Sequence, residues 1–340
     1  MFPTDNSRPG VTFSYEVKDL TKVYTSSKVA ANRDIGLDIR SGEVFGIFGT
    51  NGAGKTTLVR QMAGLLRPTS GAIRLLGHDV VADPSVVPHF VSYYDQKVMA
   101  LRAHKVHEVI LHTAIFRGLS VAQARSATHD LLDRFGLGSV ADRPMFKLSG
   151  WQQRQTALLA SLVGDRPVLI LDEPTNELDP TKRRQVWDYL WELNQQRGTT
   201  IILVTHNVME AEQVVERVAI IDQGRVVALG TPGELKAAVD GSVRVEVRLR
   251  PTSAAASALP GDGRAAAGAS AADAFARFPG AVRLREGQYR ITAPREQAQQ
   301  LFRAVLDRVG LDRLDDFRLV TPSLEDVYIH FTAKERSEPA

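Results

Sequence analysis

The residues from Gly49 to Thr56, in the order GTNGAGKT, have the spacing of a phosphate-binding loop, G-x-x-x-x-G-K-[ST]. Glycine at positions 49, 52 and 54 lets backbone N–H groups close around phosphate oxygens, and the N-terminus of a following helix adds partial positive charge. Lys55 is expected to meet the β- and γ-phosphates, and the Thr56 hydroxyl to meet Mg²⁺. A plain glycine turn is the alternative, but the apolar segment before the loop and the helix-like segment after it favour a nucleoside triphosphate site. The predicted contacts are Gly49, Asn51, Gly52, Ala53, Gly54, Lys55, Thr56 and Thr57.

A pair of carboxylates, Asp172 and Glu173, follows the apolar run from Val168 to Leu171. In a parallel α/β sheet, ligands gather beyond the carboxyl ends of the strands, so this pair is expected to face the phosphate loop. There Asp172 can hold Mg²⁺ through water, and Glu173 can orient and deprotonate an attacking water. The alternative is that both carboxylates are merely solvated where a strand ends, but the phosphate loop upstream favours the catalytic interpretation.

Residues 11 to about 240 alternate between strand-like and helix-like patterns, which predicts an α/β fold. Apolar runs predict strands at Val44–Phe48, Phe90–Tyr94, Val168–Leu171, Ile201–Val204 and Val218–Ile221. Because these strands are apolar throughout, helices are expected to cover both faces of a largely parallel sheet. A helix is predicted from Thr57 to Leu66, and Asp222-Gln223-Gly224 predicts the turn of a hairpin from Arg217 to Ala228.

A helical insert is expected over about residues 97–165, between the strands at Phe90 and Val168. Apolar spacing predicts a helix from Lys105 to Phe116. Ser120 and Gln123 form a capping box at the start of another helix, which runs to Phe135. We interpret the insert as a helical subdomain within a domain of residues 1–240.

Residues 241–340 are predicted to form a small appended α+β domain. Its expected elements are strands at Val243–Leu249 and Asp316–Thr321, a hairpin at Val282–Thr292 and an amphipathic helix at Arg295–Val309. An Ala- and Gly-rich stretch at 251–273 has the composition of a linker and interrupts this domain.

The composition is that of an ordinary soluble chain. Its 340 residues allow about two domains, with 44% hydrophobic and 24% charged residues. No apolar run approaches the ~20 residues that cross a bilayer, so the chain is not expected to span a membrane by itself. The N-terminal sequence lacks the pattern of an export signal, and the absence of cysteine excludes disulfides and thiolate metal sites, which together favour the cytoplasm. A net charge of +3 is too small to indicate nucleic acid.

The order of the motifs identifies a family. GTNGAGKT is followed by Gln96, by Leu148-Ser149-Gly150-Trp151-Gln152, by LILDEP, by Leu178-Asp179 and by His206. Over about residues 11–240 this series resembles the ATP-binding subunit of an ABC transporter. The resemblance implies a P-loop NTPase of the α/β class, with a mostly parallel sheet, an antiparallel N-terminal subdomain and a helical insert. It also implies an ATPase that uses ATP and Mg²⁺.

By this resemblance, three residues outside the loop acquire roles. Tyr24 would stack on adenine, which suits its π-face. Gln96 would lie near Mg²⁺ and the attacking water and relay their state to the helical insert, and His206 would contact the γ-phosphate. Taken alone, Tyr24 would be a packing residue, Gln96 an exposed glutamine at a strand end, and His206 a satisfied polar residue after a buried strand.

The segment from Ser149 to Gln152 resembles the family's signature, whose helix N-terminus faces the nucleotide held by another cassette. Ser149, Gly150 and Gln152 would therefore contact ATP across an interface, and neither subunit alone would complete a site. Asp179 resembles the residue that connects the two sites. A local N-cap role is the alternative for both Ser149 and Asp179. A homodimer of cassettes is expected, although a second, different cassette stays open.

Three positions depart from the family's pattern. Trp151 stands where the signature has a second glycine, Glu177 where a glycine is usual before Leu-Asp, and Thr50 where the loop usually has proline. If this position needs a left-handed backbone, tryptophan would cost roughly 1 to 2 kcal/mol, and its indole adds bulk. We therefore expect slower ATP turnover than with the full signature.

The segment from Pro322 to Tyr328 resembles the closing motif of the drug- and polysaccharide-exporter subgroup. The alternative is a short amphipathic helix with Leu324, Val327 and Tyr328 inward, and both can hold together. The resemblance implies an ATPase that powers a separate transmembrane permease. The permease would export drug-like, lipid or polysaccharide molecules and would bind this chain at about Lys97 to Leu119. The chain would then be peripheral, on the cytoplasmic face of the cell membrane.

Two other functions stay open. A soluble ATPase of the same superfamily could act on ribosomes or DNA, but the sequence shows neither a long central coiled coil nor a second phosphate loop. A regulatory ATP-binding module with weak hydrolysis fits Trp151, whereas the intact Glu173 and His206 argue against it.

Overall fold

The computed structural model describes residues 12–25, 29–95, 103–176, 178–207, 212–239, 242–250, 275, 278, 280–320 and 322–337. The chain divides into two compact units. One runs to Pro232 and also takes in the end of the chain from Phe331, and the other runs from Gly233 to His330. The predicted linker, Gln96 and Glu177 lie outside the described residues.

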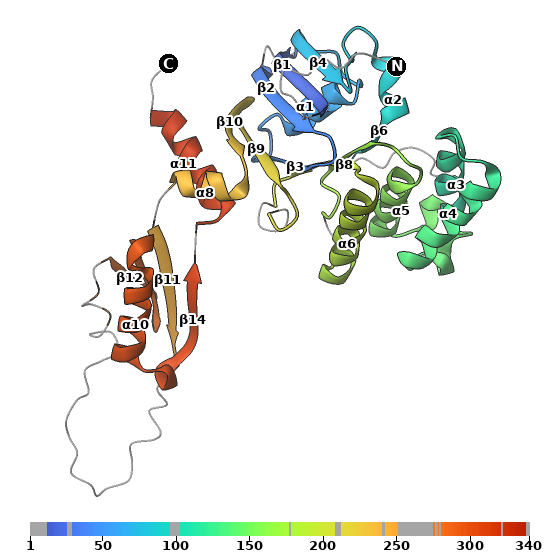
Figure 1. Cartoon of the computed structure of the whole chain (residues 1–340). Helices are drawn as coiled ribbons and strands as arrows, with labels where there is room; N and C mark the ends of the chain where they lie inside the picture. Colours follow the sequence, from blue (N-terminus) through green and yellow to red (C-terminus); the bar gives the residue numbers. More distant parts are fainter. Residues whose placement is uncertain are drawn as a thin grey trace, which may run out of the picture. The chain divides into compact units, whose positions relative to one another are not determined.

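Six strands form the central sheet of the first unit (Figure 1): β3 (Val44–Phe48), β6 (Val91–Tyr94), β7 (Val168–Asp172), β8 (Thr200–Thr205), β9 (Arg217–Asp222) and β10 (Arg225–Gly230). Their order is β10-β9-β3-β8-β7-β6. All neighbours from β9 to β6 are parallel, and β3, β7 and β8 are buried at every residue. Strands of this kind are covered on both faces, as the sequence predicted. β10 returns antiparallel to β9 through Gln223 and Gly224, which both have positive φ.

A second, antiparallel sheet of the first unit contains β1 (Phe13–Val23), β2 (Ala30–Arg40), β4 (Ser70–Leu75) and β5 (His78–Asp79), in the order β2-β1-β4-β5. Helix α1 (Lys55–Met62) packs between the two sheets, because its Leu58, Val59 and Met62 share one buried core with side chains of both. This packing fixes the loop that precedes α1.

The helical insert contains α3 (Val106–Phe116), α4 (Val121–Arg134) and α5 (Gly150–Leu162), and α3 contacts the other two. The predicted capping box of Ser120 and Gln123 opens α4, and a second one, Ser149 with Gln152, opens α5. Two 3₁₀ turns, Gly138–Val140 and Met145–Lys147, lie in the segment that connects α4 to α5. The chain then passes through β7 and α6 (Pro180–Arg197) to β8.

Several predicted boundaries were wrong, among them the start of the strand predicted from Asp316, which begins at Leu314, and two have a clear cause. The helix after the phosphate loop spans Lys55–Met62 and not Thr57–Leu66, because Gly54 is already its N-cap and the chain turns away at Gly64 with a φ of 69°. The strand predicted from Phe90 begins at Val91, because Phe90 ends the short helix α2 (Val87–Phe90), which follows a 3₁₀ turn at Pro84–Val86.

The second unit has its own sheet, with β11 (Ser242–Leu249), β12 (Ala281–Arg285), β13 (Gln288–Pro294) and β14 (Leu314–Val320) in the antiparallel order β12-β13-β11-β14. Helix α10 (Ala298–Val309) shares a buried core with the residues of one sheet face, among them Val245 and Ile291. The second unit also has 3₁₀ turns at Arg295–Gln297 and Leu311–Arg313, and the helices α8 (Pro232–Val239) and α11 (Leu324–Ser337) each have residues in both units. Leu324 and Val327 are fully buried, as predicted, and Tyr328 is partly buried.

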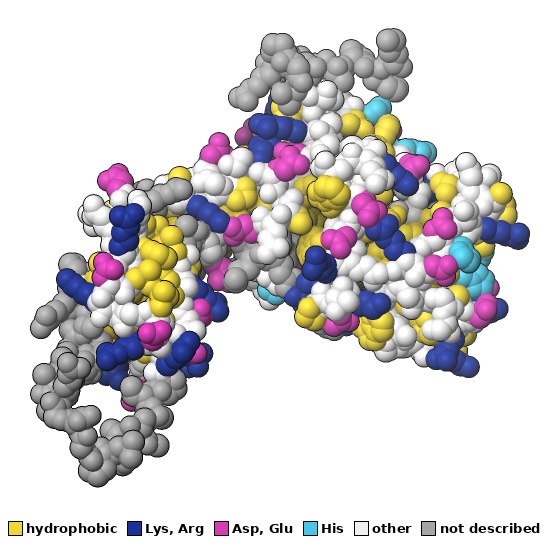
Figure 2. Space-filling view, turned by 60° about the horizontal axis from the view of Figure 1, so that its bottom comes forward, with side chains coloured by type: hydrophobic (Ala, Val, Ile, Leu, Met, Phe, Trp, Pro, Cys, Tyr) yellow, Lys and Arg dark blue, Asp and Glu magenta, His cyan; other side chains and the backbone are white. Residues whose placement is uncertain are grey.

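None of the described helices combines the length and apolarity required to span a membrane. On the face drawn in Figure 2, acidic and basic side chains are interspersed.

Candidate active site

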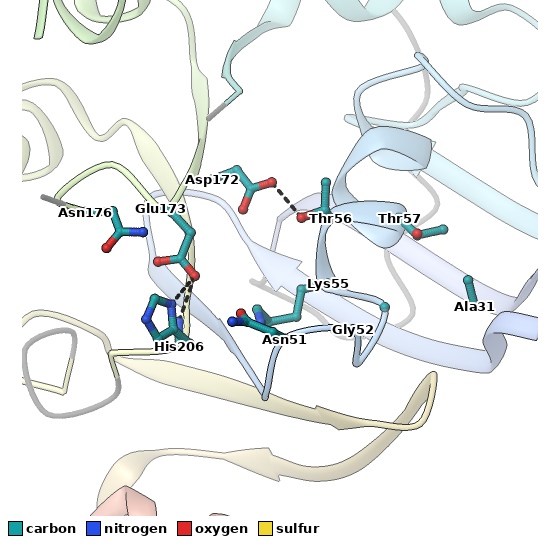
Figure 3. A pocket seen from close by; sticks show the side chains of 11 residues that line it. Ala31, Asn51, Gly52, Lys55, Thr56, Thr57, Asp172, Glu173, Asn176 and His206 are labelled. Atoms are coloured by element: carbon teal, nitrogen blue, oxygen red, sulfur yellow. Dashed lines mark hydrogen bonds and ion pairs between the residues drawn. The ribbon is translucent and has the colours of Figure 1, made fainter. Parts of the chain in front are cut away.

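A cavity of about 370 Å³ lies at the carboxyl ends of β7 and β8, beside the N-terminus of α1 (Figure 3). It is lined by Ala31, Asn51, Gly52, Gly54, Lys55, Thr56, Thr57, Asp172, Glu173, Asn176 and His206. The structure therefore brings most of the predicted phosphate-loop residues together with both predicted carboxylates and the predicted histidine.

The phosphate loop is closely packed against strands β9 and β2. A Cβ atom at Gly49 would lie 2.2 Å from the Ile221 carbonyl oxygen, and one at Gly54 would lie 2.2 Å from the Ala31 carbonyl oxygen. Only glycine fits either position, and Gly54 also has a φ of 106°. The backbone of the loop is thus held against the sheets, with its other side open to the cavity.

Lys55 folds back over this loop. Its Nζ donates to the carbonyl oxygens of Gly49 at 2.7 Å and Thr50 at 3.0 Å. Burial lowers the pKa of Lys55, while the nearby charges of Glu173 and Asp172 act in the opposite direction. A phosphate in the cavity would favour the charged ammonium group for the same electrostatic reason.

Asp172 and Thr56 form a donor set that suits Mg²⁺. The Thr56 hydroxyl donates to Asp172 Oδ2 over 2.9 Å, and Figure 3 shows the two side chains facing each other. Burial raises the pKa of Asp172 to about 6, and the charge of Glu173 adds to this, whereas the bond from Thr56 opposes it. A buried carboxylate of this kind is stabilised as an anion by a cation, and carboxylate and hydroxyl oxygens are ligands that Mg²⁺ accepts. The residues present therefore fit the ion.

Glu173 has a strained backbone, with a φ of 54° in the left-handed region. Its carboxylate is held by the end of β8. His206 Nδ1 lies 2.7 Å from Oε1, the His206 backbone N–H donates to Oε1 over 3.0 Å, and the Thr205 hydroxyl donates to Oε2 over 3.1 Å. Three groups thus fix the side chain, of which only 11% is exposed.

Sequence reasoning missed three residues of this site. Thr205 is buried and reaches Glu173, and the available signal was a hydroxyl residue directly before His206. Asn176 lines the cavity, and a polar residue in the turn after the acidic pair was the corresponding signal. Ala31 comes from β2, and a small apolar residue in a strand gives no signal for a cavity wall.

The other predicted site residues that the structure describes lie outside this cavity. Tyr24, which is 37% exposed, directly follows β1, and its hydroxyl lies 3.5 Å from Thr57 Oγ1. Ser149, Gly150 and Gln152 begin α5, and the Asp179 side chain caps α6 by accepting from the Lys182 N–H. Gly49 and Ala53 belong to the loop but face the packed side.

Trp151 is the second residue of α5 and is 37% exposed. Its backbone is helical and not left-handed, so the condition under which we expected strain at this position is not met. The large indole is what distinguishes this helix N-terminus from one that carries glycine.

The fold and the cavity define a P-loop ATPase. Residues 32–176 match the ABC transporter family, and the chain belongs to this family as an ATP-binding subunit with ATPase function. It is 40% identical to the daunorubicin/doxorubicin resistance ATP-binding protein DrrA of Streptomyces peucetius, over 72% of each chain. It is 35% identical to the daunorubicin resistance ATP-binding protein DrrA3 of Streptomyces coeruleorubidus, over 88% of this chain and 91% of the relative. A solved ATP-binding subunit of an ABC transporter matches with a TM-score of 0.62 and 27% identity, over 66% of this chain and 92% of that one.

Proposed function

We propose that two copies of this chain bind ATP between them and that its hydrolysis powers a separate transmembrane permease. The observation that carries the proposal is the convergence of Lys55, Thr56, Asp172 and Glu173 on one cavity. The names of the relatives, which refer to resistance to daunorubicin and doxorubicin, support an exporter of drug-like molecules. Lipid or polysaccharide cargo is the other possibility within this class. The chain would act on the cytoplasmic face of the membrane, held there by the permease.

The chemistry we propose is hydrolysis of the bond to the γ-phosphate. Backbone N–H groups of the loop and the Lys55 ammonium group would hold the phosphates, and His206 would contact the γ-phosphate. Glu173 would orient the attacking water and take its proton. Mg²⁺, held by Thr56 and Asp172 with Gln96, would neutralise charge on the phosphate oxygens.

Both carboxylate oxygens of Glu173 already accept hydrogen bonds, Oε2 from the Thr205 hydroxyl and Oε1 from the His206 backbone N–H. A carboxylate oxygen has room for a further donor, so a water can join without displacing Thr205 or His206. These contacts would then fix the direction in which Glu173 presents its basic oxygen.

The proposed second copy completes the site. Ser149, Gly150 and Gln152 lie at an N-terminus of a helix that does not line the cavity of their own chain. This placement supports a role across an interface, where the positive end of α5 would meet the phosphates of the partner. Residues 1–240 would form this cassette, with residues 97–165 as its helical subdomain, and residues 241–340 an appended domain.

Replacement of the proposed base tests the chemistry. Glu173→Gln should lower the rate of ATP hydrolysis by roughly 100-fold or more, because general base catalysis contributes that much. ATP binding should persist, and the variant with Mg²⁺ and ATP should elute as a dimer in gel filtration. Glu192→Gln, which removes a carboxylate that pairs with Arg134 on the outside of α6, is the control and should hydrolyse ATP at the wild-type rate. An active Glu173→Gln variant, or one that stays monomeric with bound ATP, contradicts the proposal.

Affinity capture from detergent-solubilised membranes of the native host tests the partner. Recovery of a polytopic membrane protein supports transport, whereas recovery of ribosomes or DNA contradicts it.

A further inference from the structure

Two hydrogen bonds hold the carbonyl groups of the phosphate loop from behind. Asn32 Nδ2 donates to the Gly54 oxygen over 3.1 Å, and the Gly224 N–H donates to the Ala53 oxygen over 2.9 Å. In a planar trans peptide, the C=O and the N–H of one unit point in opposite directions. The Gly54 oxygen also accepts the first helical bond of α1, from the Leu58 N–H over 2.9 Å, so Asn32 is the second of two donors that fix the direction of the Lys55 N–H. The bond to the Ala53 oxygen fixes the direction of the Gly54 N–H in the same way.

Asn32 is a fully buried residue of β2 whose amide orientation is set by a second amide. Its Oδ1 accepts from Gln61 Nε2 over 2.8 Å, and Gln61 Nε2 also donates to the Thr57 oxygen over 3.1 Å. Because Gln61 presents a donor to Oδ1, Asn32 must present its own donor, Nδ2, to the Gly54 oxygen. The hydrogen bonds thus connect Gln61 of α1 to Asn32 of β2, and Asn32 to Gly54 at the end of the phosphate loop.

The pair of Asn32 and Gln61 does not give the most stable packing at these two buried positions. Gln61 is also buried, and its Oε1 has no hydrogen-bond partner among the described residues. A buried acceptor without a partner destabilises the folded state. Apolar residues at both positions would avoid this cost, since Leu58 and Val59 of the same helix pack in an apolar core. The pair is therefore better explained by what it does to the loop.

The bond from the Gly224 N–H to the Ala53 oxygen comes from the turn between β9 and β10, which is itself hydrogen-bonded to β2. The Arg33 N–H donates to the Gly224 oxygen over 2.7 Å, and a Cβ at Gly224 would lie 2.8 Å from the Ala31 oxygen. β2 therefore supports the loop twice, directly through Asn32 and indirectly through the turn between β9 and β10.

We propose that Asn32 is a positioning residue of the ATP site, which holds the peptide between Gly54 and Lys55 so that the Lys55 N–H faces the bound phosphates. This inference rests on the proposed ATP-binding function, and Asn32 itself touches no nucleotide. Its contribution is a loop that is already ordered for phosphate before ATP arrives.

Asn32→Leu tests the proposal, because leucine has a similar volume and is suited to a buried position but cannot donate. Binding of ATP and of ADP to the full chain is measured by calorimetry, at a temperature where circular dichroism shows each variant folded. We expect about tenfold weaker binding of both nucleotides, which is the effect of one hydrogen bond of this kind. In steady-state hydrolysis, KM should rise by a similar factor while kcat changes less.

Asn194→Leu is the matched control. Asn194 is also buried, and its Nδ2 also donates to backbone oxygens, those of Gly42 at 2.6 Å and Thr199 at 3.0 Å, away from the cavity. This variant should lose stability and keep the wild-type affinity for ATP. An equal loss of affinity in both variants, or no loss in Asn32→Leu, overturns the proposal.

A further variant covers the case in which Asn32→Leu does not fold. Gln61→Met leaves Asn32 in place but removes the group that orients it, and we expect a smaller, several-fold loss of ATP affinity. Wild-type affinity in folded Gln61→Met overturns the proposal. Failure of the wild-type chain to bind ATP would instead contradict the proposed function, so the two failures are distinguishable.

Discussion

Replacement of Asp172 by asparagine should change how the stability of the protein depends on pH. Burial raises the pKa of Asp172 to about 6 in the folded chain, from an ordinary value of 3.8. The folded state therefore binds this proton more tightly than the unfolded state does, so Asp172 makes the free energy of unfolding fall as pH rises from about 4 to about 6. A pKa raised by about two corresponds to about 3 kcal/mol. Asparagine does not titrate and lacks this dependence.

Urea unfolding of wild type and Asp172→Asn, in EDTA and at several pH values between about 4 and 7, measures the effect. The carboxylates that do not interact with Asp172 titrate alike in both proteins, so their contributions cancel in the difference between the two free energies of unfolding. The stability of Asp172→Asn relative to wild type should grow by about 2 kcal/mol from the lowest to the highest pH, because the carboxyl group of the unfolded chain is already partly ionised at about pH 4. Asn194→Leu is the control, because it removes two hydrogen bonds but no titratable group, so its curve should be displaced from that of wild type and parallel to it.

Parallel curves for wild type and Asp172→Asn would refute the reasoning, because they would mean that burial does not penalise the ionised carboxylate. A second result is expected with Mg²⁺ and a non-hydrolysable ATP analogue. A cation beside Asp172 favours the ionised form, so the pH dependence assigned to this residue in the wild type should weaken.

Two further substitutions address turnover. Trp151→Gly should raise the rate of steady-state ATP hydrolysis, because it removes an exposed indole from the N-terminus of α5. Glycine in this helix should also lower the stability of the helix somewhat. A wild-type rate above that of the variant contradicts the prediction. Thr205→Val keeps the volume but removes the hydroxyl that donates to Glu173, and should lower kcat by about tenfold with little change in KM. Thr200→Val, buried on the same strand with its hydroxyl near Ser14 and the Gly42 N–H, should leave kcat unchanged, and equal effects of both would indicate a general loss of packing.

The sequence predicted the parts of the site that depend on short motifs. Gly49 to Thr56 and the pair Asp172 and Glu173 each combine a specific residue order with an apolar strand before it, and such a strand ends at a known edge of a parallel sheet. The central strands were predictable because residues such as those of β3 and β8 are apolar on both faces. The start of α1 was misplaced because Gly54, in a loop that binds anions, is also an N-cap, and glycine is only a weak sign of that role.

The contacts that orient these motifs could not be predicted in this way. Asn32 meets Gly54, Gln61 and the turn at Gly224 only after two sheets have packed on α1, and no spacing in the sequence relates these positions. The left-handed backbone of Glu173 is equally hidden, since glutamate has no preference for it and the surrounding bonds impose it.

The place of β11 in the second unit has a consequence for the integrity of the chain. β11 precedes residues 251–273, yet it is hydrogen-bonded on one edge to β13 and on the other to β14, which both follow them. The unit is thus assembled from two stretches of polypeptide that meet in the middle of one sheet. Proteolytic cleavage between these stretches would give two fragments that stay joined by the backbone hydrogen bonds of β11 to β13 and of β11 to β14. The fragment that carries the ATP site would therefore retain the C-terminal fragment without a covalent link.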